Sequence, residues 1–125
     1  MKTLTLSIKQ TFFDEIKSGN KKEEVREIRA NTSGKYIEYQ VNGEKMKIKE
    51  VPADATDVEC VPIKYDQIRF LTGEYKGKRP SMLVEVLGED IIILTDEQGD
   101  DIVYEYEGFE YVAAEIRYKL GKVID

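Results

Sequence analysis

Residues 3–28 read TLTLSIKQTFFDEIKSGNKKEEVREI, and this stretch decides the fold. Over residues 2–8, apolar and polar side chains alternate strictly, and a period of two predicts a half-buried β-strand. A short helix is expected near residues 10–18, with Phe12 and Phe13 both in the core and a glycine directly after its last residue. The stretch therefore predicts a strand, a short helix and then a second strand.

The second strand is expected over residues 21–28, although a propensity scale favours helix for this Lys- and Glu-rich run. Further along, Asn42-Gly43 separates two strand-like runs and is the strongest short hairpin signal in the chain. Separate strands are expected over residues 82–86 and 90–95, whereas residues 51–62 look irregular. One early helix followed by about seven or eight short strands predicts a mainly β (α+β) fold, a closed or partly closed β-barrel with one short N-terminal helix.

Length and composition bound the class of protein. The chain has 125 residues, of which 41% are hydrophobic and 35% charged, so residues 1–125 are expected to form a single globular domain. The longest apolar run, residues 91–94, is far shorter than the roughly 20 residues that cross a bilayer, so no membrane partner is expected. No signal peptide is visible, which favours a cytoplasmic location.

Two residue types are scarce, and their scarcity removes classes of chemistry. The chain has no histidine, which excludes histidine-based triads, proton shuttles and metal sites. Cys60 is the single cysteine, so an intramolecular disulfide and a cysteine-rich zinc site are excluded, and we expect a half-buried structural thiol. No metal and no cofactor is expected, and any catalysis falls to Lys, Glu, Asp, Tyr, Arg, Ser or Thr.

The net charge of −6 is unevenly distributed along the chain. Residues 1–50 hold 11 basic and 8 acidic side chains, whereas residues 89–125 hold 3 basic and 11 acidic ones. Because an acidic protein repels phosphate backbones, tight binding of duplex DNA is not expected. The charge distribution still allows a local basic cleft, formed by the first two-thirds of the chain, that binds RNA or a nucleotide.

One run of charged residues at the start of the second strand carries a candidate site. In an extended strand, Glu24 and Arg26 point to the same side, and Lys21 stands at the corner between helix and strand. A paired Arg presents a planar fork to a phosphate or a base edge, and a Lys beside another cation can act as a base or nucleophile. The alternative is a solvated strand face with ordinary surface ion pairs.

A second basic segment holds Arg69, Tyr75 and Lys76, the last two in a Gly- and Lys-rich stretch. Basic side chains next to an aromatic ring suit contact with a phosphate and a stacked base. A solvated loop is the alternative. The chain has eight tyrosines, and we expect most of those in strands to form cross-strand packing pairs.

Several stretches together resemble a known family. The run L-S-I-K (residues 6–9), followed by F-D-x-I-K-S-G-x-K-K-x-E-x-R-E-I (residues 13–28), resembles the ASCH family of the PUA-like superfamily. The signature of that family is a strand, a short helix and a Gly-x-Lys-x-x-Glu-x-Arg run. Two later stretches are similar to a phage- and bacterial-type branch of it: I-R-F-x-x-G (residues 68–73) continuing to K-R-P-S-M-L-V-E-V (residues 78–86), and K-L-G-K-V-I (residues 119–124).

The resemblance, which leaves out residues 29–62, implies a PUA-like β-barrel with a cleft beside the helix–strand corner. The family is thought to bind RNA or nucleotides there. One branch hydrolyses the amide of N4-acetylcytidine with a Lys that corresponds to Lys21 and a Thr three residues later. In this chain Glu24 stands at the position of that Thr.

These observations lead to one favoured function and two alternatives. We expect nucleotide or single-stranded RNA binding in a charged cleft with Lys21, Glu24 and Arg26 on its floor. Further ligand-binding residues are expected around that cleft: Lys9, Arg69, Tyr75 and Lys76. The first alternative is an amidohydrolase that acts on an acylated modified nucleoside such as N4-acetylcytidine, with Lys21 as the base and Glu24 assisting. The second is a phage or mobile-element accessory protein that binds a protein partner through its acidic C-terminal third.

Overall fold

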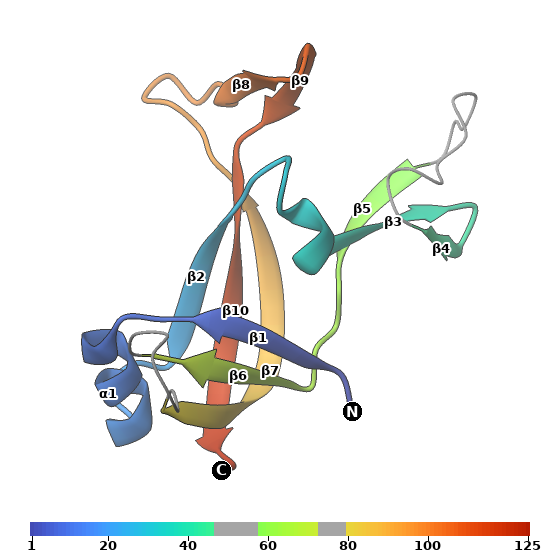
Figure 1. Cartoon of the computed structure of the whole chain (residues 1–125). Helices are drawn as coiled ribbons and strands as arrows, with labels where there is room; N and C mark the ends of the chain where they lie inside the picture. The colour runs from blue at the N-terminus through green and yellow to red at the C-terminus, as the bar shows by residue number, and fades with distance from the viewer. Residues whose placement is uncertain (47–57, 73–79) are drawn as a thin grey trace. The chain divides into compact units, whose positions relative to one another are not determined.

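The computed structural model describes residues 1–46, 58–72 and 80–125 of the chain. This part is mainly β-structure with a single α-helix, and it contains no helix long and apolar enough to cross a membrane (Figure 1). The helix near residues 10–18 is confirmed as α1 (Gln10–Ser18), and the strand over residues 21–28 is confirmed as β2 (Glu23–Ile28). The other elements, in chain order, are β1 (Thr3–Ser7), a 3-10 turn η1 (Ser33–Lys35), β3 (Ile37–Val41), β4 (Glu44–Met46), β5 (Val58–Pro62), β6 (Gln67–Leu71), β7 (Ser81–Ile93), β8 (Val103–Tyr106), β9 (Phe109–Val112) and β10 (Ala114–Val123).

The strands form one larger sheet and two small ones. The larger sheet has the strand order β1-β6-β7-β10-β2, and the smaller sheets have the orders β4-β3-β5 and β8-β9. β1 runs parallel to β6, from Thr3 opposite Gln67 to Ser7 opposite Leu71, whereas β6 runs antiparallel to β7. Figure 1 shows that β7 bends after it leaves β6, which curls the five-stranded sheet in the manner of half a barrel. The predicted mainly β fold with one early helix is therefore confirmed.

The chain divides into two compact units. Unit 1 comprises Met1–Val25, Lys64–Glu89 and Arg117–Asp125, and unit 2 comprises Arg26–Ile63 and Asp90–Ile116. The bounds fall inside β2, β7 and β10, so each of these strands contributes residues to both units.

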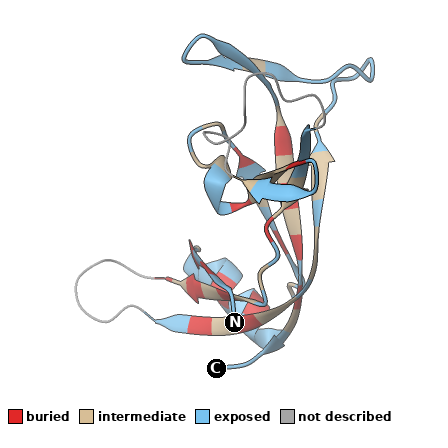
Figure 2. Cartoon of the chain, turned by 90° about the vertical axis from the view of Figure 1, so that its right-hand side faces the viewer, coloured by how far each residue is buried: buried red, intermediate tan, exposed pale blue. Residues whose placement is uncertain are grey.

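The core of unit 1 combines one face of α1 with alternate residues of its strands (Figure 2). Phe13 and Ile16 are the buried residues of α1, and the Thr72 hydroxyl donates a hydrogen bond to Gln10 Oε1 at 3.3 Å at the start of the helix. Phe12 is 43% exposed, so its predicted place in the core is wrong. Successive helix residues point about 100° apart, and only one of two adjacent phenylalanines can face the sheet. The buried hydrophobic strand residues of unit 1 are Leu4, Leu6, Ile68, Phe70, Met82, Val84, Tyr118 and Leu120.

Unit 2 carries two tight hairpins whose turn residues have positive φ. Asn42 (φ 53°) and Gly43 (φ 83°) connect β3 to β4, as the sequence predicts. Glu107 (φ 50°) and Gly108 (φ 82°) connect β8 to β9 in the same way. Two consecutive left-handed residues match the right-handed twist of the strands that they join. These turns set the register of both hairpins, with Tyr39 opposite Met46 in one and the Tyr104–Tyr111 pair in the other.

Two sequence predictions about strand boundaries are wrong. β5 (Val58–Pro62) lies in the segment that looks irregular, because it pairs with β3 along its whole length; residues 51–57 of that segment lie outside the described residues. β7 runs without a break from Ser81 to Ile93, where two strands joined at Gly88 are predicted. Gly88 does not adopt a left-handed φ, so nothing in its backbone ends the strand there.

Candidate functional site

The corner between α1 and β2, in unit 1, is held by backbone hydrogen bonds. Gly19 ends the helix with φ 86°, a left-handed conformation that glycine adopts without strain. The carbonyl of Glu15 accepts hydrogen bonds from the N–H groups of Asn20 (2.9 Å) and Lys21 (3.0 Å). One residue later, the Lys22 carbonyl accepts a hydrogen bond from the N–H of Leu120 in β10 at 2.9 Å. The backbone at Lys21 is therefore fixed from the helix side and from the sheet side.

The side chain of Lys21 lies between a carboxylate and an aromatic ring. Its Nζ is 3.5 Å from Oε1 of Glu24 and 5.4 Å from the centroid of the Phe12 ring. Glu24 is 5% exposed and is, with Thr72, one of the two buried polar residues in the described part of the chain. A buried carboxylate is stable only when it is paired and hydrogen-bonded, and Lys21 supplies the cation. The structure thus brings together the two residues proposed as catalytic, Lys21 and Glu24.

The predicted faces of β2 are confirmed by its burial pattern. Glu24 and Ile28 are buried and Arg26 is half-buried, whereas Glu23, Val25 and Glu27 are exposed. Arg26 falls within unit 2, so the corner of unit 1 consists of Lys21, Glu24 and Phe12.

The remaining predicted ligand-binding residues are spread over other elements. Lys9 is exposed at the N-cap of α1. Arg69 is half-buried in β6, and its Nη1 lies 3.5 Å from the hydroxyl oxygen of Ser81 in β7. Both belong to unit 1. Tyr75 and Lys76 lie outside the described residues.

The two units carry net charges of opposite sign. By sequence, unit 1 holds 13 basic and 9 acidic side chains, whereas unit 2 holds 6 basic and 16 acidic ones. The Lys21 corner therefore belongs to a unit with a net charge of +4, in a chain whose total is −6. The summed charge of a unit sets the sign of the ligand that it attracts over several ångströms.

Unit 2 contains a cavity of about 200 Å³ with tyrosines among its lining residues. The aromatic members are Tyr39, Tyr104 and Tyr111, and isoleucines and Val112 make up much of the remainder. The rings of Tyr104 and Tyr111 stack across the β8–β9 hairpin with a centroid distance of 5.7 Å and an interplanar angle of 24°. Tyr39 lies in β3, directly opposite Cys60 of β5. Most of the lining is apolar or aromatic, with few polar groups, which is typical of a small-molecule site.

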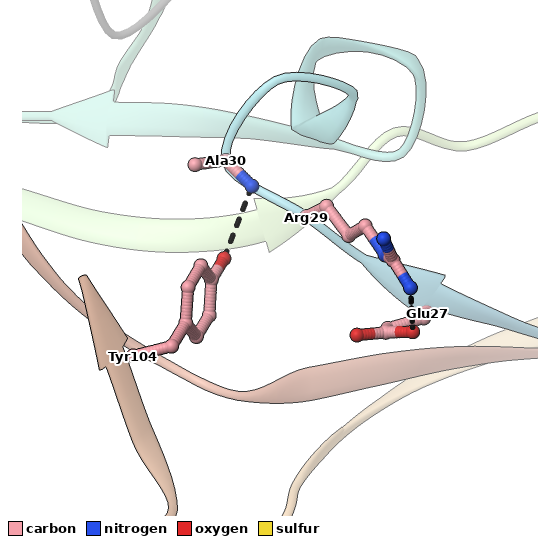
Figure 3. Close-up of polar contacts among 4 residues, drawn as sticks. All are labelled: Glu27, Arg29, Ala30 and Tyr104. Carbon is pink, nitrogen blue, oxygen red and sulfur yellow. Dashed lines mark hydrogen bonds and ion pairs between the residues drawn. The ribbon is translucent and has the colours of Figure 1, made fainter. Parts of the chain in front are cut away.

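The hydroxyl of Tyr104, one of the lining residues, contacts the backbone of another. It accepts a hydrogen bond of 3.0 Å from the backbone N–H of Ala30 (Figure 3). Beside it, Arg29 Nη2 and Glu27 Oε2 form an ion pair of 3.0 Å. Arg29, Ala30 and Tyr104 also line a second, more polar hollow of about 380 Å³, together with Glu27, Asn31 and Tyr106.

Two titratable groups of the cavity, Tyr39 and Cys60, have raised pKa values. Burial raises the pKa of Tyr39, and the neighbouring Cys60 and Tyr111 raise it further. Partial burial also raises the pKa of the Cys60 thiol, although Cys60 is exposed as a residue rather than half-buried as the sequence predicts. At neutral pH the cavity therefore presents a phenol and a thiol, both neutral hydrogen-bond donors.

Sequence reasoning treated these tyrosines as packing pairs and missed the cavity. Tyr104 and Tyr111 are indeed a cross-strand pair, which confirms that part of the prediction. The available signal was their spacing around Gly108, which places both rings on one face of a hairpin. The contact with Ala30, 74 residues away, has no local signal in the sequence.

The described residues contain no group of three His, Cys, Asp or Glu side chains that could hold a metal ion. Comparison of the chain with known protein families, curated proteins and solved structures found no match.

Proposed function

We propose that the chain binds nucleotides or short single-stranded RNA at the Lys21 corner of unit 1. The observation that carries this proposal is the grouping of an exposed aromatic ring, an ammonium group and a buried carboxylate. Phe12 offers its ring to solvent, Lys21 lies beside it at 5.4 Å, and Glu24 lies 3.5 Å from the ammonium.

Each of the three groups matches one part of a nucleotide. A base can stack on the Phe12 ring, an interaction typically of about 1–3 kcal/mol per base. The Lys21 ammonium is a donor for a phosphate oxygen. The Glu24 carboxylate accepts a hydrogen bond from an exocyclic amino group of a base. An unstacked base is needed for all three contacts, which favours single-stranded over duplex nucleic acid.

The charge of unit 1 supports an anionic ligand of modest affinity. A net charge of +4 attracts phosphates, but the acidic remainder of the chain opposes a long polyanion. Lys9 and Arg69, and outside the described residues Tyr75 and Lys76, remain proposed rim contacts for phosphates and bases. Arg26 remains a proposed ligand contact on the strength of the sequence. We expect binding to be weak and to weaken with salt.

We also propose that the fold is a PUA-like barrel of the ASCH family and that the protein acts in the cytoplasm. The support is the strand–helix–strand start, the curled β-sheet, and the Gly-x-Lys-x-x-Glu-x-Arg run that spans the corner. In this proposal Glu24 is the Glu of that run, at the position where the amide-hydrolysing branch has a threonine, and it provides the carboxylate of the site.

Fluorescence anisotropy with a labelled ten-nucleotide RNA, at low and high salt, tests the function. Lys21→Gln keeps an unbranched stem and a polar end but removes the charge, and it should weaken binding by roughly 10- to 150-fold, the value of a charge-assisted hydrogen bond. Lys17→Gln, in the last turn of α1, is the matched control and should change binding by less than about 2-fold. Equal effects from both substitutions, or equally tight binding of duplex DNA, would contradict the proposal.

A second candidate function is hydrolysis of an acylated nucleoside such as N4-acetylcytidine. The observation that favours it is the direct contact of Lys21 with the buried Glu24. An ammonium can donate a hydrogen bond to the acyl oxygen, and a carboxylate can accept a proton from the attacking water, so we assign the first role to Lys21 and the second to Glu24. The sequence expectation assigned the role of base to Lys21 instead.

Release of acetate from N4-acetylcytidine, followed by mass spectrometry, separates the enzyme from the binding protein. The enzyme predicts turnover that Glu24→Gln abolishes. Binding of the nucleoside without release of acetate would rule out the hydrolase and leave the binding function intact.

A further inference from the structure

We propose that the tyrosine-lined cavity of unit 2 binds a small organic cation with an apolar body, such as an aryl quaternary ammonium. This inference concerns a different unit from the Lys21 corner and does not rest on the nucleotide-binding proposal. It rests on the shape and lining of the cavity and on the charge around it.

The lining suits a cation that is poorly hydrated. Tyr39, Tyr104 and Tyr111 contribute ring surface, and the negative face of an aromatic ring attracts an organic cation placed over it. The volume of about 200 Å³ accommodates one small molecule and excludes a polymer. The stacked Tyr104–Tyr111 pair is fixed by the hairpin register and by the hydrogen bond to Ala30, so these rings are ordered before the ligand enters.

The charge of unit 2 selects a cation over an anion. Residues 90–116 hold nine acidic side chains and no basic one. Among the described residues that line the cavity, Arg29 alone is charged, and the carboxylate of Glu27 lies 3.0 Å from its guanidinium. On β8 and β9, Glu105 and Glu110 are directly opposite each other, on the other face of the hairpin from Tyr104 and Tyr111, and they belong to the acidic charge of this unit.

The polar groups of the cavity fit the same ligand. Tyr39 and Cys60 lie opposite each other across β3 and β5, and neither a phenol nor a thiol carries a positive charge in any protonation state. The second hollow, which shares Arg29, Ala30 and Tyr104 with the cavity, provides room for a polar substituent. An apolar cation with one polar tail therefore matches both hollows.

Cys60 is the only cysteine in the chain and lines the cavity, so it reports occupancy. The rate of its alkylation by iodoacetamide is measured by mass spectrometry with three probes of similar size: phenyltrimethylammonium, its neutral isostere tert-butylbenzene, and the anion benzenesulfonate. We expect protection by the cation at about 2- to 30-fold lower concentration than by the neutral isostere, the range of a cation–π interaction, and none by the anion. Equal protection by the cation and its isostere would overturn the proposal, as would protection by benzenesulfonate or no protection by the cation.

Two variants of Tyr111 test whether protection by the cation requires an aromatic ring or only an apolar side chain at this position. Tyr111→Phe keeps the ring and should keep the protection by phenyltrimethylammonium. Tyr111→Leu keeps apolar bulk without the ring and should lose most of it, whereas Tyr65→Leu, in unit 1, should have no effect. Unchanged protection in Tyr111→Leu would overturn the role of the ring. The comparison of the three probes on the natural chain decides the proposal even where a variant fails to fold, and the RNA titration of Lys21→Gln is independent of both.

Discussion

The hydroxyl of Tyr104 accepts a hydrogen bond of 3.0 Å from the backbone N–H of Ala30, 74 residues earlier in the chain. It joins the β8–β9 hairpin to the segment that follows β2, within unit 2. Ala30 lies in a turn two residues beyond the end of β2, and its part-buried N–H needs a partner. The Tyr104 hydroxyl thus takes the place of a backbone acceptor in a neighbouring strand, and the hydrogen bond fixes the position of the Tyr104 ring in the lining of the cavity.

Tyr104→Phe should destabilise the fold by about 1–3 kcal/mol, because the N–H of Ala30 loses its acceptor while the ring remains. Urea unfolding gives the free energy of unfolding. Tyr106→Phe, in the same strand but exposed, is the control and should stay within about 0.5 kcal/mol of the natural chain. A loss of the same size in both variants would show that the Ala30 contact has no special weight.

Two neighbouring glutamates in β2 should differ in their effect on stability. Glu24→Gln removes the charge of a buried carboxylate beside Lys21 and should cost about 1–3 kcal/mol. Glu23→Gln removes an exposed partner of Arg117 at 4.0 Å and should cost about 0–1 kcal/mol. Thermal melting of both variants in parallel checks this order, and a larger loss for Glu23→Gln would contradict it.

The two phenylalanines of α1 should separate stability from binding. Phe13→Ala empties a core position and should cost about 3–5 kcal/mol of stability. Phe12→Ala should cost less than about 1 kcal/mol of stability, because its ring is exposed, but should weaken RNA binding by about 1–3 kcal/mol. Urea unfolding and RNA anisotropy measure the two effects separately. Unchanged RNA binding in a folded Phe12→Ala variant would remove the stacking platform from the proposal.

Stability should fall at alkaline pH. Burial raises the pKa of Cys60 and of Tyr39 in the folded chain, so the unfolded chain releases these protons first as the pH rises. The contribution of Cys60 to the free energy of unfolding is complete at pH values below the ordinary thiol pKa of about 8.5. It is lost as the pH rises through the raised pKa of the folded chain. Urea unfolding from pH 7 to 10.5 should show a shallower decline for Cys60→Ser than for the natural chain. If the free energy of unfolding of Cys60→Ser declined as steeply as that of the natural chain, or more steeply, the raised pKa of Cys60 would not explain the alkaline loss of stability.

The sequence predicts the order of the first elements well because their signals are local. The alternation in β2 outweighs the helix propensity of its Lys and Glu residues, since one face of the strand is buried at Glu24 and Ile28. The turn at Asn42-Gly43 is local as well, because both residues tolerate a positive φ. β5 escapes prediction because its strand character comes from pairing with β3 and not from its own residues.

The two candidate sites also differ in whether their residues are close together in the sequence. Lys21 and Glu24 are three positions apart at one corner, so the sequence brings them together without knowledge of the tertiary fold. The choice between Phe12 and Phe13 depends on where the sheet lies relative to α1, which no local pattern contains. The cavity of unit 2 depends on segments that lie far apart in the chain, among them those that carry Ala30, Cys60, Ile91 and Tyr104.

The parallel pairing of β1 with β6 has a consequence for biosynthesis. Its partners are 64 residues apart, and both ends are fastened: Lys2 to Asp66 at the start, and the N–H of Ile8 to the carbonyl of Leu71 at the end. A ribosome that adds about 5–20 residues per second needs roughly 3–13 s to pass from one strand to the other. During that interval the first strand has left the ribosome without its partner, with Leu4 and Leu6 available to a chaperone. Closing so long a loop also places the chain among the slower-folding small proteins.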